Sequence, residues 1–472
     1  MGREEHSQEW LRYREKKEFI ARGSEDAARR EKKEEELGLT TGAERKSRSR
    51  VVSGMRPTGR LHIGHYFGAL ENWVRLQNDP GYECFYFIAD WHALTSDYAD
   101  TSGVAQNTME IMTDYLAAGL DPAKSVIFQQ SLVPEHAELH LLLSMVTPLS
   151  WLERVPTYKE ALENVKDRDL HNYGFLGYPC LQTADIVIYS ERAIAGKEGT
   201  ALFVPVGEDQ VSHVELSREI VRRFDLLYGT QPDEQLKSNT GLMGEIYQRL
   251  EIRGSTPDIR DFPLAGETWD RATSAIRARV LEIGRANALK RLESAAGYVR
   301  FHEVLTEPGV MLTKTPKIPG LDGRKMSKSY GNAITLSETD EEIRKKTKVM
   351  VTDPARKRRT DPGNPDVCPV YDWHKLFSAG EPGRLEWVRQ GCTTAGIGCI
   401  ECKAAMAENL IKWIAPVRER RVKWENNQKG VLEMIDDGSK RARVEAKKTM
   451  ERVREAVFHW KDKRREIGGD SA

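Results

Sequence analysis

The fold is decided by residues 50–66, which have the sequence RVVSGMRPTGRLHIGHY. The first five of these residues are typical of a short strand, and Pro57 and Gly59 then turn the chain. After the turn, apolar residues recur at helical spacing, and residues 84–89 form a continuous apolar run. A strand, a helix and a second buried strand in this order indicate the beginning of a β/α alternation.

The alternation of strands and helices continues along the chain. A helix is predicted near residues 103–119, and further strands are predicted at residues 126–128 and 202–206. Gly207 follows the last of these strands and precedes a helix whose apolar residues again recur at helical spacing. This order predicts an α/β fold, a Rossmann-like doubly wound parallel sheet that binds ligands at the carboxyl ends of its strands.

The composition limits the class of protein. A chain of 472 residues is long enough for two or three domains, and 39% hydrophobic with 31% charged residues is typical of a globular protein. No apolar run reaches the roughly 18 residues that a membrane-spanning helix needs. Lys and Arg number 72, as do Asp and Glu, so the net charge gives no evidence for a nucleic-acid partner. The N-terminus is rich in Glu and lacks an apolar signal segment, so we expect a cytoplasmic protein.

Changes in composition divide the chain into segments. The N-terminal segment is rich in Lys, Arg and Glu and is expected to be a disordered extension. A long helix near 437–465 is predicted to place one apolar face against the protein, formed by Ala446, Met450, Val453, Val457 and Trp460. The predicted segments are 1–49 (extension), 50–227 (α/β unit), 228–296 (helical insertion of unknown role), 297–342 (return to the α/β unit), 343–465 (helical) and 466–472 (tail).

The first helix of the α/β unit opens with His62-Ile63-Gly64-His65. A helix N-terminus presents free N–H groups and the positive end of the helix dipole. The two imidazoles can donate hydrogen bonds to phosphate oxygens, and the small Gly64 lets a ligand approach the backbone. Alone, this tetrapeptide is a weak signal, because two surface histidines can produce it by chance.

A second motif occupies residues 325–329, which have the sequence Lys-Met-Ser-Lys-Ser in a loop bounded by Gly323 and Gly331. The ammonium groups of Lys325 and Lys328 can converge on one polyphosphate. They would stabilise the charge that develops on a departing pyrophosphate. A mobile basic loop is the alternative, which the exact five-residue string disfavours.

The two motifs, in this order and context, resemble the signature pair of class I aminoacyl-tRNA synthetases. The resemblance implies that an amino-acid carboxylate attacks the α-phosphate of ATP, and that the acyl group then passes from the adenylate to the terminal ribose of tRNA. It also implies Mg²⁺, for which the sequence offers no ligand motif. By the same resemblance, the catalytic residues are His62, His65, Lys325 and Lys328. The ATP-binding set adds Met55, Arg56, Thr58, Gly64, Gly207, Asp209, Met326, Ser327 and Ser329.

Three stretches narrow the resemblance to the tryptophanyl enzymes. They are residues 53–59, 152–160 and 204–210. Tyrosyl enzymes, the nearest relatives of that family, usually carry a different lead-in to the first motif. The resemblance covers roughly residues 50–227 and 303–465.

The segment around Asp185 resembles the amino-acid pocket of that family. A buried carboxylate accepts the single N–H of an indole and rejects a side chain without a donor, such as phenylalanine. The resemblance implies that Tyr178 and Gln210 hold the α-ammonium group, and that His92, after a strand end, borders the site. Gln182 also belongs to the pocket, but many bacterial tryptophanyl enzymes carry Met there. Because Gln occurs in tyrosyl-like pockets and a carboxylate also accepts a phenol hydroxyl, tyrosine remains the alternative substrate.

Four cysteines lie late in the chain, at Cys368, Cys392, Cys399 and Cys402. Four thiolates suit either a tetrahedral zinc ion or a [4Fe–4S] cluster, and the spacing does not choose between them. Some bacterial tryptophanyl-tRNA synthetases carry a nearly identical array in their helical anticodon-binding domain, where it holds a [4Fe–4S] cluster. The resemblance to that subgroup favours a cluster with a structural role. It also implies that residues 343–465 form the anticodon-binding domain.

The family implies tRNA(Trp), L-tryptophan and a second copy of the chain as partners. The Lys and Arg residues at 344–348 and 356–359 form either a solvated face or a contact for tRNA phosphates. One alternative function is a nucleotidyltransferase that adenylates a small substrate without tRNA, which the long helical segment after the second motif disfavours. The other is a non-catalytic sensor of tryptophan or of iron–sulfur status, which the presence of both complete motifs disfavours.

Overall fold

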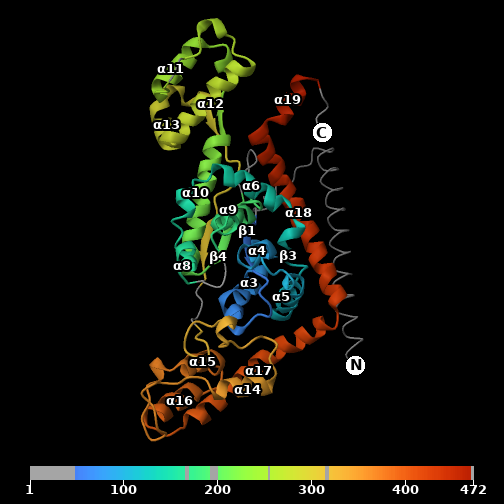
Figure 1. The fold of residues 1–472 in the computed structure, drawn as a ribbon, viewed down its shortest axis with the longest axis vertical. Coiled ribbons are helices and arrows are strands. Elements are labelled where there is room, and N and C mark those ends of the chain that lie inside the picture. Colours follow the sequence, from blue (N-terminus) through green and yellow to red (C-terminus); the bar gives the residue numbers. More distant parts are fainter. Residues whose placement is uncertain (1–47, 165–169, 192–199, 254–255, 314–317, 469–472) are drawn as a thin grey trace.

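The molecule is elongated, and its main parts follow one another along the long axis (Figure 1). The structure, a computed structural model, describes residues 48–164, 170–191, 200–253, 256–313 and 318–468. The expectation of a disordered N-terminal extension therefore concerns residues outside the described ranges, apart from the last two. Among the described residues, no helix is long and apolar enough to cross a membrane.

The central part is a parallel sheet of five strands in the order β3-β2-β1-β4-β7. Every neighbouring pair is parallel, so the doubly wound sheet predicted from the sequence is confirmed. The strand at 309–312 was not predicted, because it begins with glycine directly after Pro308, a pair typical of a turn. The strands are β1 (Ser49–Met55), β2 (Tyr82–Ile88), β3 (Val126–Gln129), β4 (Leu202–Val206) and β7 (Gly309–Leu312).

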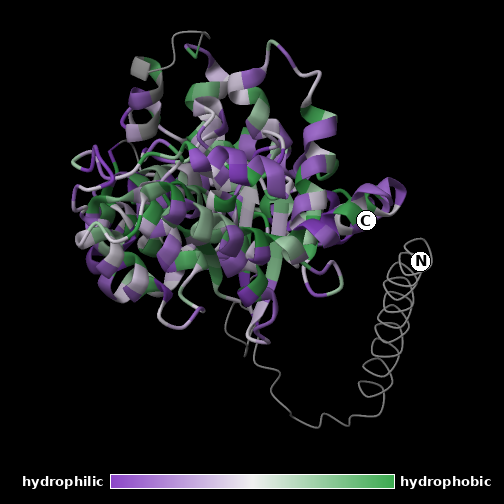
Figure 2. Ribbon diagram, turned by 90° about the horizontal axis from the view of Figure 1, so that it is seen from below, coloured by the Kyte–Doolittle hydropathy of each residue, from purple (hydrophilic) through white to green (hydrophobic). Residues whose placement is uncertain are grey.

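Side chains that alternate along the strands enter two separate cores. Val51 and Tyr86 belong to one core, whereas their neighbours Val52 and Phe85 belong to the other. Both faces of the sheet are therefore covered, as expected for parallel strands. Apolar residues gather in the interior and hydrophilic residues along the outer helices (Figure 2). The helices of this part are α2 (Ile63–His65), α3 (Glu71–Gln77), α4 (Asp90–Asp97), α5 (Val104–Ala118), α6 (Glu135–Val146), α7 (Leu149–Leu152), α8 (Pro156–Asn164), α9 (Tyr173–Val187) and α10 (Val211–Tyr228).

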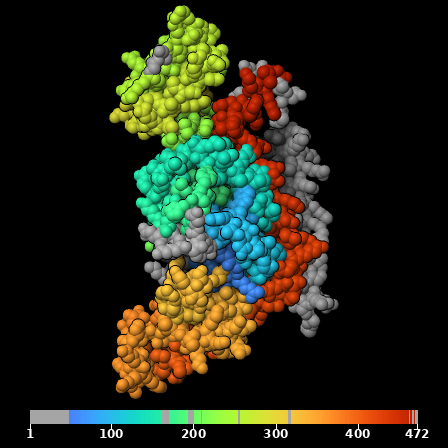
Figure 3. Space-filling model, viewed as in Figure 1, coloured from blue at the N-terminus to red at the C-terminus, as the bar shows by residue number. Residues whose placement is uncertain are grey.

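Residues between β5 (Thr230–Pro232) and β6 (Val299–Phe301) form a projection at one end of the molecule (Figures 1 and 3). The two strands pair in an antiparallel manner at its base. The helices above them pack around a hydrophobic core of their own. They are α11 (Thr240–Leu250), α12 (Gly266–Ile283) and α13 (Arg285–Leu292).

The opposite end of the molecule is helical (Figure 1). The long C-terminal helix begins earlier than predicted and ends at Phe458, because His459 adopts a left-handed conformation with φ of 52°. The prediction that Trp460 joins its apolar face was therefore wrong, since this side chain is 61% exposed. The helices are α14 (Asp340–Lys348), α15 (Pro369–Phe377), α16 (Arg384–Thr393), α17 (Cys399–Glu425), α18 (Gln428–Phe458) and α19 (Trp460–Glu466).

Helix α18 returns along the α/β part and packs directly on the edge strand β3 (Figure 1). A Cβ atom on Gly438 would lie 1.7 Å from the carbonyl oxygen of Ile127. The next residue, Ser439, accepts a hydrogen bond at 3.2 Å from the main-chain N–H of Gln129. Only glycine allows the helix to approach this close, so Gly438 fixes the position of α18.

Replacing this glycine should destabilise the fold strongly. Gly438→Ala forces a methyl group against the backbone of β3, and we expect a loss of at least about 3 kcal/mol of unfolding free energy. Gly244→Ala is the matched control in another helix, because its Cβ would meet no atom within 4 Å. This control should be neutral or slightly stabilising. Urea unfolding measures both variants, and equal stabilities would contradict the close packing of α18 on β3.

Candidate active site

The structure brings the two sequence motifs together at the carboxyl end of β1. The Lys328 ammonium donates hydrogen bonds to the carbonyl oxygens of Thr58 at 2.6 Å and Arg60 at 3.0 Å. The segment after the Lys-Met-Ser-Lys-Ser loop also pairs with the backbone beside the first motif, since Ile63 N–H donates to the Ile334 carbonyl at 3.0 Å. The two motifs thus form one site, although they are far apart in the sequence.

His62 and His65 lie against each other at the start of the first helix. Their rings are stacked with centroids 3.7 Å apart, and His65 Nδ1 accepts the His62 main-chain N–H at 3.2 Å. A Cβ on Gly64 would lie 2.9 Å from the His62 ring and 3.5 Å from the sulfur of Met326. Gly64 was expected to admit a ligand to the backbone. The structure shows that it makes room for the His62 ring and for a residue of the second motif.

Both imidazoles of the first motif are neutral at neutral pH. Burial, and then the positive charge of Lys328, lower the pKa of His62 to about 4. Burial lowers the pKa of His65 to about 3, with smaller contributions from His62 and Lys328. A neutral imidazole still carries one N–H donor, so each histidine can donate to a phosphate oxygen without itself bringing a charge.

Hydrogen bonds within the second motif hold its loop in place. Met326 is buried, whereas Lys325 and Ser329 are exposed. The Ser327 main-chain N–H donates to the side-chain oxygen of Asn332 at 2.7 Å. Lys325 is therefore exposed to solvent, while the neighbouring Met326 is packed inside the protein.

The other residues predicted to bind ATP lie around the same sheet edge. Met55 ends β1, and its carbonyl oxygen accepts the N–H of Ala89 at 2.8 Å. Arg56 lies 3.3 Å from the Asp97 carboxylate at the end of α4. Gly207 follows β4 and precedes the 3₁₀ turn that contains Asp209, whose side chain is outside the described part of the chain.

Helix α9 carries three of the predicted amino-acid-binding residues. Tyr178, Gln182 and Asp185 follow one another at intervals of four and three residues, which places them on one face of the helix. The Tyr178 hydroxyl lies 3.4 Å from His213 Nε2, near the start of α10. Gln210 immediately precedes α10, and α10 packs against α9.

Asp185 is fully buried and accepts hydrogen bonds from three side chains. His92 Nε2 lies 2.8 Å away, His136 Nδ1 2.6 Å away, and Gln130 Nε2 2.7 Å away. Burial alone raises the pKa of Asp185, but the hydrogen bonds from His136 and His92 outweigh it and lower the pKa to about 2. Since an ionised carboxylate only accepts, His136 donates from Nδ1 and accepts the Tyr189 hydroxyl at Nε2, 2.8 Å away.

Gln130 and His136 were not predicted from the sequence. Gln130 directly follows β3, at the sheet edge where ligands of parallel sheets bind, so its position in the sequence offered a signal. His136 lies on α6 among apolar residues and has the pattern of an ordinary core histidine. Only the meeting of α6 and α9 reveals its partner Asp185.

The four late cysteines lie within electrostatic reach of one another. Burial, and then the neighbouring Cys368, Cys392 and Cys399, raise the pKa of Cys402 to about 12. Arg356, predicted as part of a solvated or tRNA-binding set, is instead buried, with Nη1 3.7 Å from the Cys392 sulfur. In the described ranges, no three His, Cys, Asp or Glu side chains are close enough together to hold a single metal ion.

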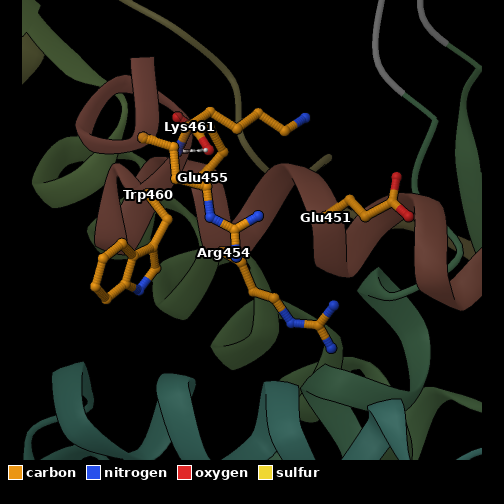
Figure 4. A pocket seen from close by; sticks show the side chains of 6 residues that line it. Glu451, Arg454, Glu455, Trp460 and Lys461 are labelled. Carbon is orange, nitrogen blue, oxygen red and sulfur yellow. Dashed lines mark hydrogen bonds between the residues drawn. The ribbon is translucent and has the colours of Figure 1, made fainter. Parts of the chain in front are cut away.

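A cavity of about 300 Å³ lies between α18 and α19 (Figure 4). Its wall includes a partly exposed indole and charged groups of both signs, and the Lys461 main-chain N–H donates to Glu455 at 3.2 Å. None of the predicted site residues lines it, so it is distinct from the candidate active site. The lining residues are Glu451, Arg454, Glu455, Trp460, Lys461 and Arg464.

Comparison with known proteins identifies the family. The family described as "tRNA synthetases class I (W and Y)" matches residues 44–251 and 280–415. A tryptophan--tRNA ligase from Ralstonia nicotianae is 46% identical over 86% of this chain and 98% of its own length. One from Thermotoga maritima is 44% identical with the same coverage. The crystal structure of tryptophanyl-tRNA synthetase from Campylobacter jejuni complexed with ADP and tryptophan has a TM-score of 0.60 and 26% identity, covering 86% of this chain and 99% of that one.

The chain therefore belongs to the class I tRNA synthetases of the tryptophan and tyrosine family. Within this family it is a tryptophan–tRNA ligase, like the relatives that it matches over nearly their whole length.

Proposed function

We propose that the residues gathered at the carboxyl edge of the sheet carry out both half-reactions of this ligase in the cytoplasm. In the first, a carboxylate oxygen of tryptophan attacks the α-phosphorus of ATP, and the bond to the β-phosphate breaks to release pyrophosphate. In the second, a ribose hydroxyl of tRNA(Trp) attacks the acyl carbon, and AMP leaves. The observation that carries the proposal is the meeting of Lys328 with the loop before His62.

His62, His65, Lys325 and Lys328 bind and stabilise the phosphates. Lys328 is already held beside the first motif by two carbonyl oxygens, and phosphate oxygens replace them when ATP binds. The two neutral imidazoles donate N–H groups at the helix N-terminus. Lys325, exposed on the same loop, adds a second ammonium as charge moves onto the departing pyrophosphate. Mg²⁺ accompanies the nucleotide in reactions of this kind.

The carboxylate of Asp185 recognises the indole N–H. The carboxylate accepts from His92, Gln130 and His136, and the Gln130 amide nitrogen lies within hydrogen-bond distance of both of its oxygens. An indole N–H would therefore take the place of one of these donors. Since the carboxylate stays ionised in the buried pocket, a ligand without a donor leaves it unsatisfied and binds poorly. Tyr178 and Gln210 lie nearby and hold the α-ammonium group.

The test is ATP–pyrophosphate exchange with each of the twenty amino acids, without tRNA. We expect exchange with tryptophan alone, and Lys328→Ala should reduce it by about a hundredfold or more, because a charge that stabilises the leaving group is lost. Lys290→Ala, an exposed lysine on α13, is the control and should retain full activity. Exchange with tyrosine would refute the assigned specificity. Absence of exchange with every amino acid would refute the catalytic role of the site.

We propose that Cys368, Cys392, Cys399 and Cys402 hold a [4Fe–4S] cluster in the helical domain. Four thiols at one place match the donor set of such a cluster. A tetrahedral zinc ion is the alternative occupant of four thiolates. The guanidinium of Arg356 beside Cys392 would offset the negative charge of the thiolates. A bound cluster would be held by cysteines of α16 and α17 and by the cysteine directly before α15.

Reconstitution distinguishes the cluster from zinc. Anaerobic reconstitution should yield about four iron atoms per chain and visible absorbance. Cys399→Ser should lower the iron content and the thermal stability, whereas Cys84→Ala, remote in β2, should retain the iron. One zinc per chain with no retained iron would show that the site binds a single ion instead.

We propose that the helical domain from α14 to α18 binds the anticodon of tRNA(Trp). Exposed basic side chains on its surface, such as Lys345 and Lys348, supply contacts for phosphates. The family relationship supports this assignment.

We also propose that the enzyme is a homodimer whose subunits meet through α6 and the elements beside it. Apolar side chains are unusually exposed there, with Met145 70% and Leu141 53% accessible. Tyr173 at the start of α9, 62% exposed, continues this surface beside His140. A second copy of the chain would cover these groups symmetrically.

Sedimentation velocity tests the dimer. The wild type should sediment as a dimer at micromolar concentration, and Met145→Glu should shift it toward the monomer, because a charge would then be buried at the interface. Val444→Glu is the control. Val444 lies on α18 and is 55% exposed, so this variant should leave the dimer intact. A monomeric wild type would overturn the proposal.

A further inference from the structure

Arg421 is a buried arginine that connects the helical domain to the α/β part. It lies on α17, is only 1% exposed, and forms ion pairs with Glu110 and Asp114 of α5. Its Nε also lies 3.1 Å from Glu425, one turn along its own helix. A guanidinium removed from water needs such partners, so the pairs between α17 and α5 are a fixed feature of the interface.

Asp114 extends this contact to the first motif. It is fully buried, with one carboxylate oxygen accepting from Arg421 and the other from the main-chain N–H of Leu61 at 2.6 Å. Leu61 directly precedes His62, and its own carbonyl oxygen accepts the N–H of Leu336 at 2.9 Å. The backbone that sets the direction of His62 is therefore held by a carboxylate that Arg421 holds in turn.

The same acidic residues also contact the loop to which Lys328 is bound. Arg60 Nε lies 3.1 Å from Glu110, and its Nη2 lies 4.0 Å from Glu425. The Arg60 carbonyl oxygen is one of the two that accept from Lys328. The carboxylates that pair with Arg421 thus contact residues 60 and 61, where the two motifs meet.

We propose that Arg421 and Asp114 are positioning residues for ATP, which act by fixing the Leu61–His62 backbone against the Lys328 loop. This inference rests on the proposed function of the two motifs. Without Arg421, the buried carboxylate of Asp114 loses its counter-charge and either takes up a proton or moves, and Leu61 loses a charged acceptor. Burial already raises the pKa of Asp114 to about 6 despite the arginine, so the carboxylate depends on this partner. The proposed tryptophan-binding residues lie on α9, so the contact of Arg421 and Asp114 with the Leu61 backbone does not position tryptophan.

The experiment is steady-state ATP–pyrophosphate exchange on the full chain, with the KM values for ATP and for tryptophan measured separately. For Arg421→Met we expect about a tenfold or greater rise in the ATP KM or fall in kcat, the effect of one charge-assisted hydrogen bond. The tryptophan KM should stay within about twofold of wild type. Arg421→Lys should recover part of the loss. Arg389→Met, which breaks the exposed pair with Asp366 in the same helical domain, is the control and should not affect either KM.

A double variant separates positioning from stability. In Asp114→Leu/Arg421→Met the ion pair is replaced by apolar side chains, a change that commonly preserves folding. The Leu61 N–H still lacks its acceptor, so the ATP defect should persist while the thermal unfolding midpoint stays near that of wild type. This measurement also decides the question if Arg421→Met does not fold.

The outcomes are distinguishable. A wild-type ATP KM and kcat in the folded double variant would overturn the positioning role, as would equal increases in both KM values, which indicate general loosening. A wild-type enzyme without any exchange would instead overturn the proposed function on which the inference rests.

Discussion

The active site depends on the parallel pairing of β1 with β2 on one side and β4 on the other. Parallel strands end at the same edge, so the segments that follow each of them are brought to one place. His62 follows β1, His92 follows β2, Gln130 follows β3 and Gly207 follows β4. These residues are far apart in the sequence, and the pairing of the strands brings them to one edge of the sheet. The strand order therefore brings together the proposed phosphate-binding and amino-acid-binding groups, before any side chain adds specificity.

Local patterns predicted the sheet and the motifs but not the contacts that join them. The apolar run at 84–89 and the glycine-flanked Lys-Met-Ser-Lys-Ser loop are continuous in sequence, so periodicity and residue type sufficed. Strand β7 was missed because it begins at Pro308-Gly309, a dipeptide typical of a turn. His136 and Arg421 were missed because each resembles a common residue on a helix, and its role depends on a partner in another element. The left-handed conformation of His459, which ends α18, also has no clear signal in the sequence.

Helix α17 joins two regions that the sequence separates. It begins at Cys399, in the cysteine group, and carries Arg421 near its other end. A helix rises about 1.5 Å per residue, so α17 spans roughly 30 Å between them, with Pro416 inside it. The cysteine group and the backbone beside His62 are therefore connected by one helix rather than by a loop.

The contact of Gly438 with Ile127 bears on how the chain is made. An uncovered edge strand is a template for pairing with other chains, and here α18 closes that edge through Gly438 and Ser439. The helix occupies residues 428–458, so it leaves the ribosome after all five strands. During synthesis the sheet exists for a time with β3 open, and nascent chains on neighbouring ribosomes are exposed to intermolecular strand pairing until the last helix docks. The C-terminal helix thus covers a strand edge that would otherwise stay open to other chains.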